Sequence, residues 1–243
     1  MPTLQRQPTV SYDSQQFERR IREYAAERPG MRLRILEAGC GRRWTLDLEG
    51  VDYHLTGLDA NEHSMRMRID EVGDLDEAIV GDLRTAELEL GSYDVVFNSF
   101  VLEHIAGARQ VLDLMVGALR PGGLLLLRIP DRDSMYGFIT RHTPHRLHVT
   151  YKRRIRGKKL AGTPGRGPFP TVYDKVVSYR GIVDYCASAG LVIESAYSSN
   201  HHIDFFGRLA PVVDRGLRTA AALSFGRLTA DHSNLSFIIR KAA

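Results

Sequence analysis

Short apolar runs alternate with helix-like segments through the first half of the chain. Five runs are typical of strands, and they lie at residues 33–37, 55–59, 78–82, 93–98 and 124–129. Segments that favour helices lie at 11–28, 42–48, 61–69 and 108–119. Strands that alternate with helices indicate right-handed crossovers and a parallel sheet, so the sequence predicts an α/β fold.

The alternation stops at Pro130 and resumes near residue 179. A helix over 179–189, a strand over 191–195 and a last strand over 235–240 complete the predicted sheet. The segment 131–177 is too long for an ordinary loop, and we interpret it as an insertion over the carboxyl edge of the sheet. We expect 1–243 to form a single domain, with an N-terminal helix at 11–28 and substrate-binding insertions at 131–177 and 200–231.

Composition narrows the class of protein. The chain has 243 residues, of which 43% are hydrophobic, and this is enough for a full core. It holds no apolar run of about 18 residues and no secretory pattern at its start, so we expect no transmembrane segment. The two cysteines, Cys40 and Cys186, show no paired or metal-like spacing, which favours the cytoplasm.

Positive charge is concentrated in one segment. Residues 134–173 contain no Asp or Glu but nine basic residues: Arg141, Arg146, Lys152, Arg153, Arg154, Arg156, Lys158, Lys159 and Arg166. This run is either a solvated face or a surface that attracts an anionic substrate, a lipid surface or nucleic acid.

The strongest chemical signal is at the first strand, which ends in Glu37 and is followed by Gly39, Cys40 and Gly41. Glycines at this point allow a tight turn that a nucleotide can approach closely. Two further strands end in Asp59 and Asp82. Ligands of open α/β sheets bind at the carboxyl ends of strands, so these three acids are expected around one ligand.

The acids favour a particular nucleoside. A dinucleotide site would need a third glycine where this chain has Trp44, and Glu37 would repel a pyrophosphate. Carboxylates can accept from ribose hydroxyls, from the adenine amine and from an ammonium group. S-adenosylmethionine carries all three groups, so we prefer it to a nicotinamide cofactor.

A series of motifs supports this choice. In order, they are Glu37-Ala38-Gly39-Cys40-Gly41, Asp59, Gly81-Asp82-Leu83, residues 93–99, Leu102-Glu103-His104 and residues 119–123. Together they resemble the class I S-adenosylmethionine-dependent methyltransferases. The resemblance implies a Rossmann-like seven-stranded sheet with helices on both faces. It also implies an insertion after the fifth strand and an antiparallel last strand between the fifth and sixth.

The resemblance also implies a cofactor site. Gly39 and Gly41 would line the methionine part, Asp59 the ribose, and Asp82 with Leu83 the adenine, while Asn98 would lie near the sulfonium. The full predicted set is Glu37, Gly39, Cys40, Gly41, Asp59, Ala60, Asp82, Leu83 and Asn98. A third glycine is common in the family where this chain has Arg43, so we expect Arg42 or Arg43 to pair with the methionine carboxylate.

Histidines are candidates for the base that an O-methylation requires. His142, His145 and His148 recur at a spacing of three, and we favour His145 as the base and His148 next. The pair His201 and His202 is a second candidate. We predict no metal at the three histidines, because no cysteine joins them and Pro144 breaks a regular helix. The acidic pair Asp131 and Asp133 leaves open whether magnesium assists the reaction.

The predicted function is transfer of a methyl group to a hydroxyl of a small molecule. We rank a sugar or glycolipid above other natural-product acceptors. An acceptor that is anionic or lipid-linked is included in this prediction. The apolar segment 205–225 is expected to line the acceptor pocket, contact a second copy in a homodimer or touch a membrane. The alternatives are a carboxyl or N-methyltransferase, an RNA methyltransferase, an NAD-dependent oxidoreductase and a non-catalytic cofactor-binding protein. We expect no specific binding of nucleic acid, because no RNA-binding module is evident.

Overall fold

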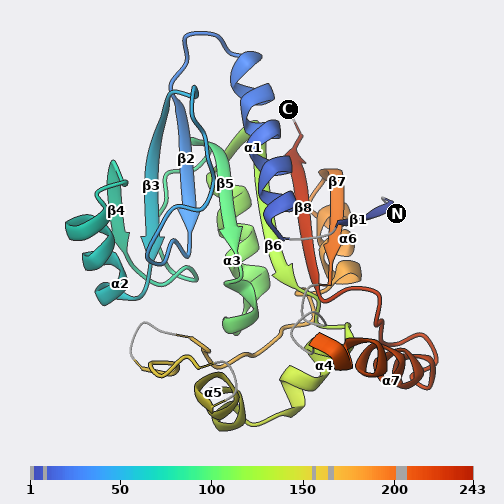
Figure 1. Ribbon diagram of the computed structural model, residues 1–243. Coiled ribbons are helices and arrows are strands. Elements are labelled where there is room, and N and C mark those ends of the chain that lie inside the picture. Colours follow the sequence, from blue (N-terminus) through green and yellow to red (C-terminus); the bar gives the residue numbers. More distant parts are fainter. Residues whose placement is uncertain (1–2, 8–9, 155–156, 164–166, 201–206, 243) are drawn as a thin grey trace.

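The computed structural model describes residues 3–7, 10–154, 157–163, 167–200 and 207–242. These residues form one sheet of eight strands (Figure 1). The strands are β1 (Leu4–Gln7), β2 (Leu33–Ala38), β3 (Tyr53–Asp59), β4 (Glu77–Val80), β5 (Tyr93–Ser99), β6 (Leu119–Pro130), β7 (Leu191–Ser199) and β8 (Asn234–Lys241). Their order across the sheet is β1-β7-β8-β6-β5-β2-β3-β4.

The topology confirms the predicted fold. Only β8 is antiparallel within the described sheet, and it lies between β6 and β7, which are the fifth and sixth of the predicted strands. The additional strand is β1, which pairs in parallel with β7 at one edge. Residues 119–123, the last of the sequence motifs, belong to β6, which starts directly after helix α3 and shifts register against β5 at this point.

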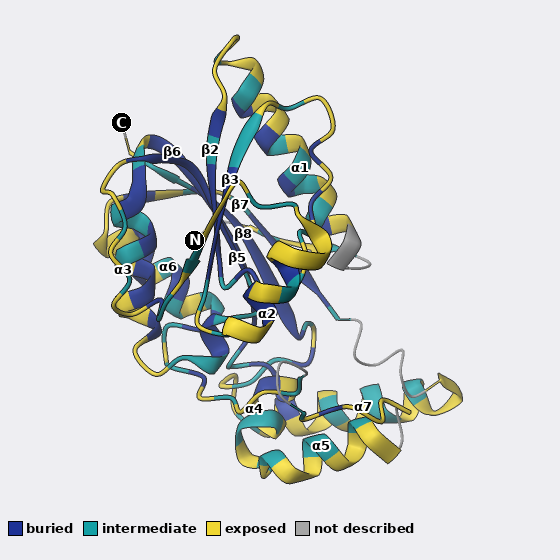
Figure 2. Ribbon diagram, turned by 90° about the vertical axis from the view of Figure 1, so that its left-hand side faces the viewer, coloured by how far each residue is buried: buried dark blue, intermediate teal, exposed yellow. Residues whose placement is uncertain are grey.

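Helices cover both faces of the sheet (Figure 2). The α-helices of the described residues are α1 (Val10–Ala26), α2 (Glu62–Met67), α3 (Ala108–Ala118), α4 (Met135–His142), α5 (His145–Arg154), α6 (Tyr179–Ser188) and α7 (Ala210–Ala222). Helix α1 packs on one face, whereas α3 and α6 pack on the other. Successive residues of a strand point to opposite faces of the sheet: Ile35 packs in the core on the α1 side, and Leu36 packs in the core on the α3 side. Among the described residues, no helix combines the length and apolar character needed to span a membrane.

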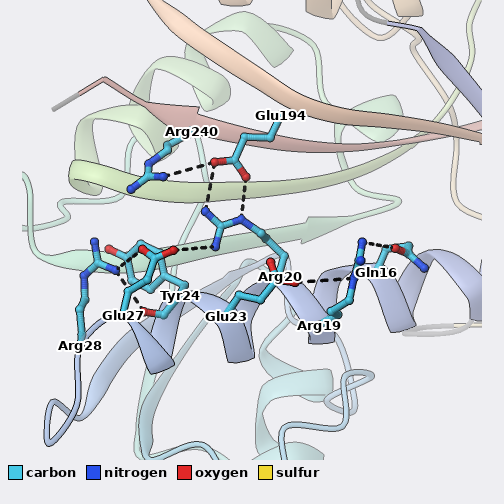
Figure 3. A network of polar contacts seen from close by, with 9 residues as sticks. All are labelled: Gln16, Arg19, Arg20, Glu23, Tyr24, Glu27, Arg28, Glu194 and Arg240. Atoms are coloured by element: carbon cyan, nitrogen blue, oxygen red, sulfur yellow. Dashed lines mark hydrogen bonds and ion pairs between the residues drawn. The ribbon is translucent and has the colours of Figure 1, made fainter.

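Helix α1 is fixed to the sheet by an apolar face and an ion pair. Phe17, Ile21 and Tyr24 are fully buried, at the helical spacing that the sequence shows. On the same helix, Arg20 donates from Nε and Nη2 to the carboxylate of Glu194 on β7, at 2.7 and 3.1 Å (Figure 3). Arg240 on β8 also contacts this carboxylate, at 3.5 Å.

This ion pair predicts how stability depends on pH. The hydrogen bonds from Arg20 hold the pKa of Glu194 below its usual range. The contribution of Glu194 is therefore complete above the pKa of an unfolded Glu and is lost as the pH falls through the lower folded value. We expect Glu194→Gln to lower the free energy of unfolding by about 1 kcal/mol at pH 7, and by less at pH 3. Urea unfolding of the variant and the wild type at pH 7 and pH 3 measures this loss in free energy. The control is Glu23→Gln, which removes the carboxylate from an exposed ion pair with Arg19. An equal deficit at both pH values would contradict it.

The predicted helix at 42–48 is wrong. Residues 41–50 form turns and extended chain, in which Leu46 and Leu48 are buried in the α1 side of the core. Trp44 lies edge-on to Phe97, with ring centroids 5.6 Å apart. The residues at 44, 46 and 48 thus alternate with exposed neighbours at a period of two, which is an extended pattern and not a helical one.

The described parts of 131–177 and of 200–231 lie beyond the carboxyl ends of the parallel strands (Figure 1). Pro144 separates α4 from α5. Helices α4 and α7 pack together through a small apolar cluster of Met135, Leu217, Ala221, Leu228 and Ala230. Asp131 Oδ2 and His232 Nε2, 2.7 Å apart, link the residue that follows β6 to the segment that precedes β8.

Candidate functional site

A cavity of about 1030 Å³ opens at the carboxyl ends of β2, β3 and β5. Eight residues of the predicted cofactor site line it: Glu37, Gly39, Cys40, Gly41, Asp59, Ala60, Asp82 and Leu83. Arg42 and Arg43 also line it. The topology of the sheet thus brings together acids that are widely separated in the sequence.

The glycine turn has a shape that side chains would disturb. Gly39 and Gly41 have φ values of +76° and +58°, in the left-handed region. A Cβ atom on Gly39 would lie 2.4 Å from Cγ2 of Val101, so a larger residue would collide there. The turn follows β2 directly, and the Gly39 N–H donates to the Leu58 carbonyl at 2.7 Å.

Asp59 supports the turn and faces the cavity. Its Oδ2 accepts from the Gly41 N–H and its Oδ1 from the Asn61 N–H, both at 2.8 Å. A carboxylate has about four acceptor positions, so two hydrogen bonds leave it able to accept from a ligand. Asn61 caps α2, because its side-chain oxygen accepts from the Ser64 N–H at the start of this helix.

Glu37 already has a cationic partner. Its Oε2 lies 2.6 Å from Nη1 of Arg68, and neither side chain is substantially exposed. Burial raises the pKa of Glu37 to about 8, and Arg68 opposes this shift. A ligand ammonium near Glu37 would therefore share the carboxylate with a buried guanidinium.

Asp82 lies outside the strand predicted for it, because β4 ends at Val80. Its carboxylate is half exposed and pairs with Arg84 at 2.5 Å. Hydrogen bonds from the Arg84 side chain and backbone lower the pKa of Asp82 to about 2. Asp82 is therefore an ionised acceptor in the lining of the cavity, next to the buried side chain of Leu83.

Asn98 is placed differently from the expectation. Its side chain is fully buried, and Nδ2 donates to the Ala38 carbonyl at 2.8 Å, so it joins β5 to the start of the glycine turn. Asn98 does not line the cavity, but the next residues, Ser99 and Phe100, do. The reason is the alternation of side chains along β5, which directs Asn98 into the sheet interior.

A second group of lining residues gives the cavity apolar walls and one imidazole. These residues are Phe100, Val101, His104, Ile105, Ala106, Phe169, Pro170 and Val172. His104 Nδ1 lies 2.8 Å from the Pro170 carbonyl. Since a carbonyl can only accept, Nδ1 carries the proton and Nε2 has the free lone pair. Burial lowers the pKa of His104, so the imidazole is neutral near pH 7.

Glu103 lies directly beside this imidazole. Its Oε1 is 3.6 Å from His104 Nε2, and burial raises the pKa of Glu103 to about 8. Its backbone carbonyl accepts from the N–H groups of Val172 and Tyr173. The 3₁₀ turn Leu102–His104 therefore holds the insertion against the end of β5.

The two histidines favoured by the sequence lie on α5. The ring centroids of His145 and His148 are 6.4 Å apart, both side chains are half-buried, and neither lines the cavity. Pro144 places them on a new helix, whereas His104 follows β5 directly. His201 and His202 lie outside the described residues. Among the described residues, no three His, Cys, Asp or Glu are grouped so as to hold a metal ion.

Sequence reasoning missed two features of the site. It gave His104 no role as a base, although the position of this residue shortly after a strand that ends at the carboxyl edge was a usable signal. It did not notice Arg68, because an arginine in an otherwise polar segment gives no sign that it is buried.

Comparisons with known proteins agree with this geometry. A family model described as a methyltransferase domain matches residues 10–195, more than half of the chain. A ubiquinone biosynthesis O-methyltransferase of Maricaulis maris (strain MCS10) is 30% identical over 147 residues, which cover 53% of this chain and 57% of that protein. The chain thus matches just over half the length of this relative.

Solved structures share the fold. An S-adenosylmethionine-dependent methyltransferase from Archaeoglobus fulgidus aligns over 94% of both chains with a TM-score of 0.52 and 18% identity. The [4+2]-cyclase SpnF aligns over 92% of this chain and 80% of its own, with a TM-score of 0.53 and 14% identity. On the strength of the family match, this chain belongs to the methyltransferase-domain family, within the class I S-adenosylmethionine-dependent methyltransferases.

Proposed function

We propose that this protein methylates a hydroxyl group of a small molecule with S-adenosylmethionine as the methyl donor. The observation that carries the proposal is the position of His104. A neutral imidazole with a free Nε2 lies in the same cavity as the glycine turn and the acids. A hydroxyl nucleophile needs a base of this kind, whereas a carboxylate acceptor does not.

The acids and the glycine turn in the lining of the cavity suit the cofactor. Asp59 would accept from the ribose hydroxyls, and Asp82 with Leu83 would hold the adenine. Gly39 and Gly41 would allow close approach of the methionine part, and Arg42 or Arg43 would meet its carboxylate. When bound, the cofactor supplies a methyl group that is activated by a positively charged sulfur.

The chain's own contributions are positioning and proton removal. The apolar walls around His104 exclude water from the reacting hydroxyl, and alignment of two bound reactants is worth up to about 7–11 kcal/mol. Nε2 of His104 receives the hydroxyl proton, and Nδ1 stays fixed on the Pro170 carbonyl. The imidazole then carries a positive charge next to Glu103.

The walls favour an aromatic hydroxyl as the acceptor. Phe100, Phe169 and Val172 present apolar surface to the cavity, and a planar ring would pack against them with little loss of polar contact. The M. maris relative is named for ubiquinone biosynthesis, which agrees with an acceptor of this class. The sugar or glycolipid that the sequence favoured would need more polar partners than these apolar walls offer.

The basic segment gives the acceptor a further property. Helix α5 carries Arg146, Lys152, Arg153 and Arg154, together with the exposed apolar residues Leu147 and Tyr151. This combination suits an acceptor that is anionic or lipid-linked, or a peripheral contact with an acidic membrane surface. Either role would make the KM for the acceptor increase with salt concentration.

An assay of S-adenosylhomocysteine formation tests the proposal. The purified protein is incubated with S-adenosylmethionine and with matched panels of phenols, sugars and glycolipids. We expect product with a phenolic hydroxyl and none with the corresponding methyl ether. Turnover only with sugars would show that the acceptor is a sugar and not a phenol. Absence of S-adenosylhomocysteine binding by calorimetry, with tight binding of a nicotinamide cofactor, would overturn the proposal.

A further inference from the structure

Arg68 is a fully buried arginine that no part of the proposed chemistry uses. Its Nη1 donates to the Cys40 carbonyl at 2.7 Å, and its Nε and Nη2 donate to the carboxylate of Asp74 at 2.8 and 3.2 Å. Asp74 Oδ2 in turn accepts from the Trp44 N–H at 3.1 Å. The two side chains therefore reach both ends of the loop 40–44.

Local backbone geometry explains how the two side chains meet. Residues Arg68–Val72 form a π-turn directly after α2, and the Gly73 N–H closes it on the Arg68 carbonyl at 2.8 Å. Gly73 has a φ of +67°, which only glycine adopts without strain. This reversal returns the chain so that Asp74 faces the Arg68 guanidinium.

The loop between these two ends is not stabilised by helical hydrogen bonds of its own. Residues 41–50 contain no helix, so no helical hydrogen bonds fix the segment that follows the glycine turn. Arg42, Arg43 and Thr45 lie on this loop and line the cavity. Their positions therefore depend on contacts made from outside the loop.

We propose that Arg68 and Asp74 are positioning residues that fix the loop 40–44 at the methionine end of the cofactor site. This inference rests on the proposed function, because it concerns the same cavity. Arg68 also contacts Glu37, so one guanidinium orients the acid before the turn and the carbonyl within it. The amino-acid part of the cofactor, but not its adenosine, should depend on this arrangement.

Two ligands separate this role from general stability. S-adenosylhomocysteine carries the amino-acid part, whereas 5′-methylthioadenosine has the same nucleoside without it. Calorimetry with Arg68→Lys, Arg68→Met and Asp74→Asn should show a loss of affinity for S-adenosylhomocysteine of about 10- to 100-fold, as expected for one to two charge-assisted hydrogen bonds. Affinity for 5′-methylthioadenosine should stay within about threefold of the wild type.

Arg66→Lys is the matched control. Arg66 lies on α2, two residues before Arg68, but is exposed and pairs only with Glu62 among the described residues, so its replacement should leave both affinities unchanged. Equal losses for both ligands, or no loss for either, in the folded variants would overturn the positioning role. If Arg68→Met does not fold, Asp74→Asn decides, because it keeps the shape of the side chain. A wild-type protein that binds neither ligand would instead overturn the proposed function.

Discussion

Replacement of His104 with alanine is expected to lower kcat by about 10²- to 10⁴-fold, the usual contribution of a general base. The loss arises because the acceptor hydroxyl would have no group to take its proton. Affinity for S-adenosylhomocysteine should be unchanged, because the proposal assigns His104, a lining residue of the cavity, to the acceptor and not to the cofactor. Single-turnover assays and calorimetry on the same preparation measure both quantities.

The matched control is His145→Ala, on α5. It removes the same side chain from a position that does not line the cavity, so we expect turnover close to the wild type. The opposite result, with His145→Ala inactive and His104→Ala active, would restore the base that the sequence favoured, and His148 would be tested next.

Burial lowers the pKa of His104, so the acidic limb of the rate profile should lie below pH 6.5.

Replacement of Asp59 with alanine is expected to weaken binding of S-adenosylhomocysteine by about 100-fold or more. A carboxylate that accepts from two ribose hydroxyls makes two charge-assisted hydrogen bonds, each worth about 1.5–3 kcal/mol. The variant also removes the acceptors for the Gly41 and Asn61 N–H groups, which loosens the turn. Calorimetric titration gives the dissociation constant.

Asp52→Ala serves as the comparison for this variant. Asp52 precedes β3, and its side chain is largely exposed beside Arg32. The same change of charge there should leave the affinity unaltered. If Asp59→Ala bound the nucleoside as well as the wild type, the ribose would have to lie elsewhere, and the assignment of the acids to one ligand would fail.

Much of the fold could be predicted because the core imposes a regular pattern. Buried parallel strands read as apolar runs, as in β5 and β6, and the residues that end them lie at one edge of the sheet by topology alone. For this reason the sequence alone predicts Glu37, Asp59 and Asp82 around one cavity. Their contacts with the cofactor remain predictions.

The remaining features depend on tertiary contacts that leave little local trace. The strand β1 has a single apolar residue, Leu4, and exists through backbone pairing with β7. The loop at 42–48 had a length that fitted two helical turns, but the burial of Leu46 and Leu48 selected an extended chain. Arg68 belongs to the same class, since only the folded chain places acids and a carbonyl around it.

One hydrogen bond has a consequence for the choice of acceptor. The proton on His104 Nδ1 is held by Pro170, a residue that belongs to the wall of the cavity. An acceptor bulky enough to push this wall outward would release the ring from its anchor and turn the lone pair of Nε2 away from the nucleophile. Discrimination against oversized acceptors would then be expressed in the rate of the chemical step, even where such compounds bind tightly and act as inhibitors.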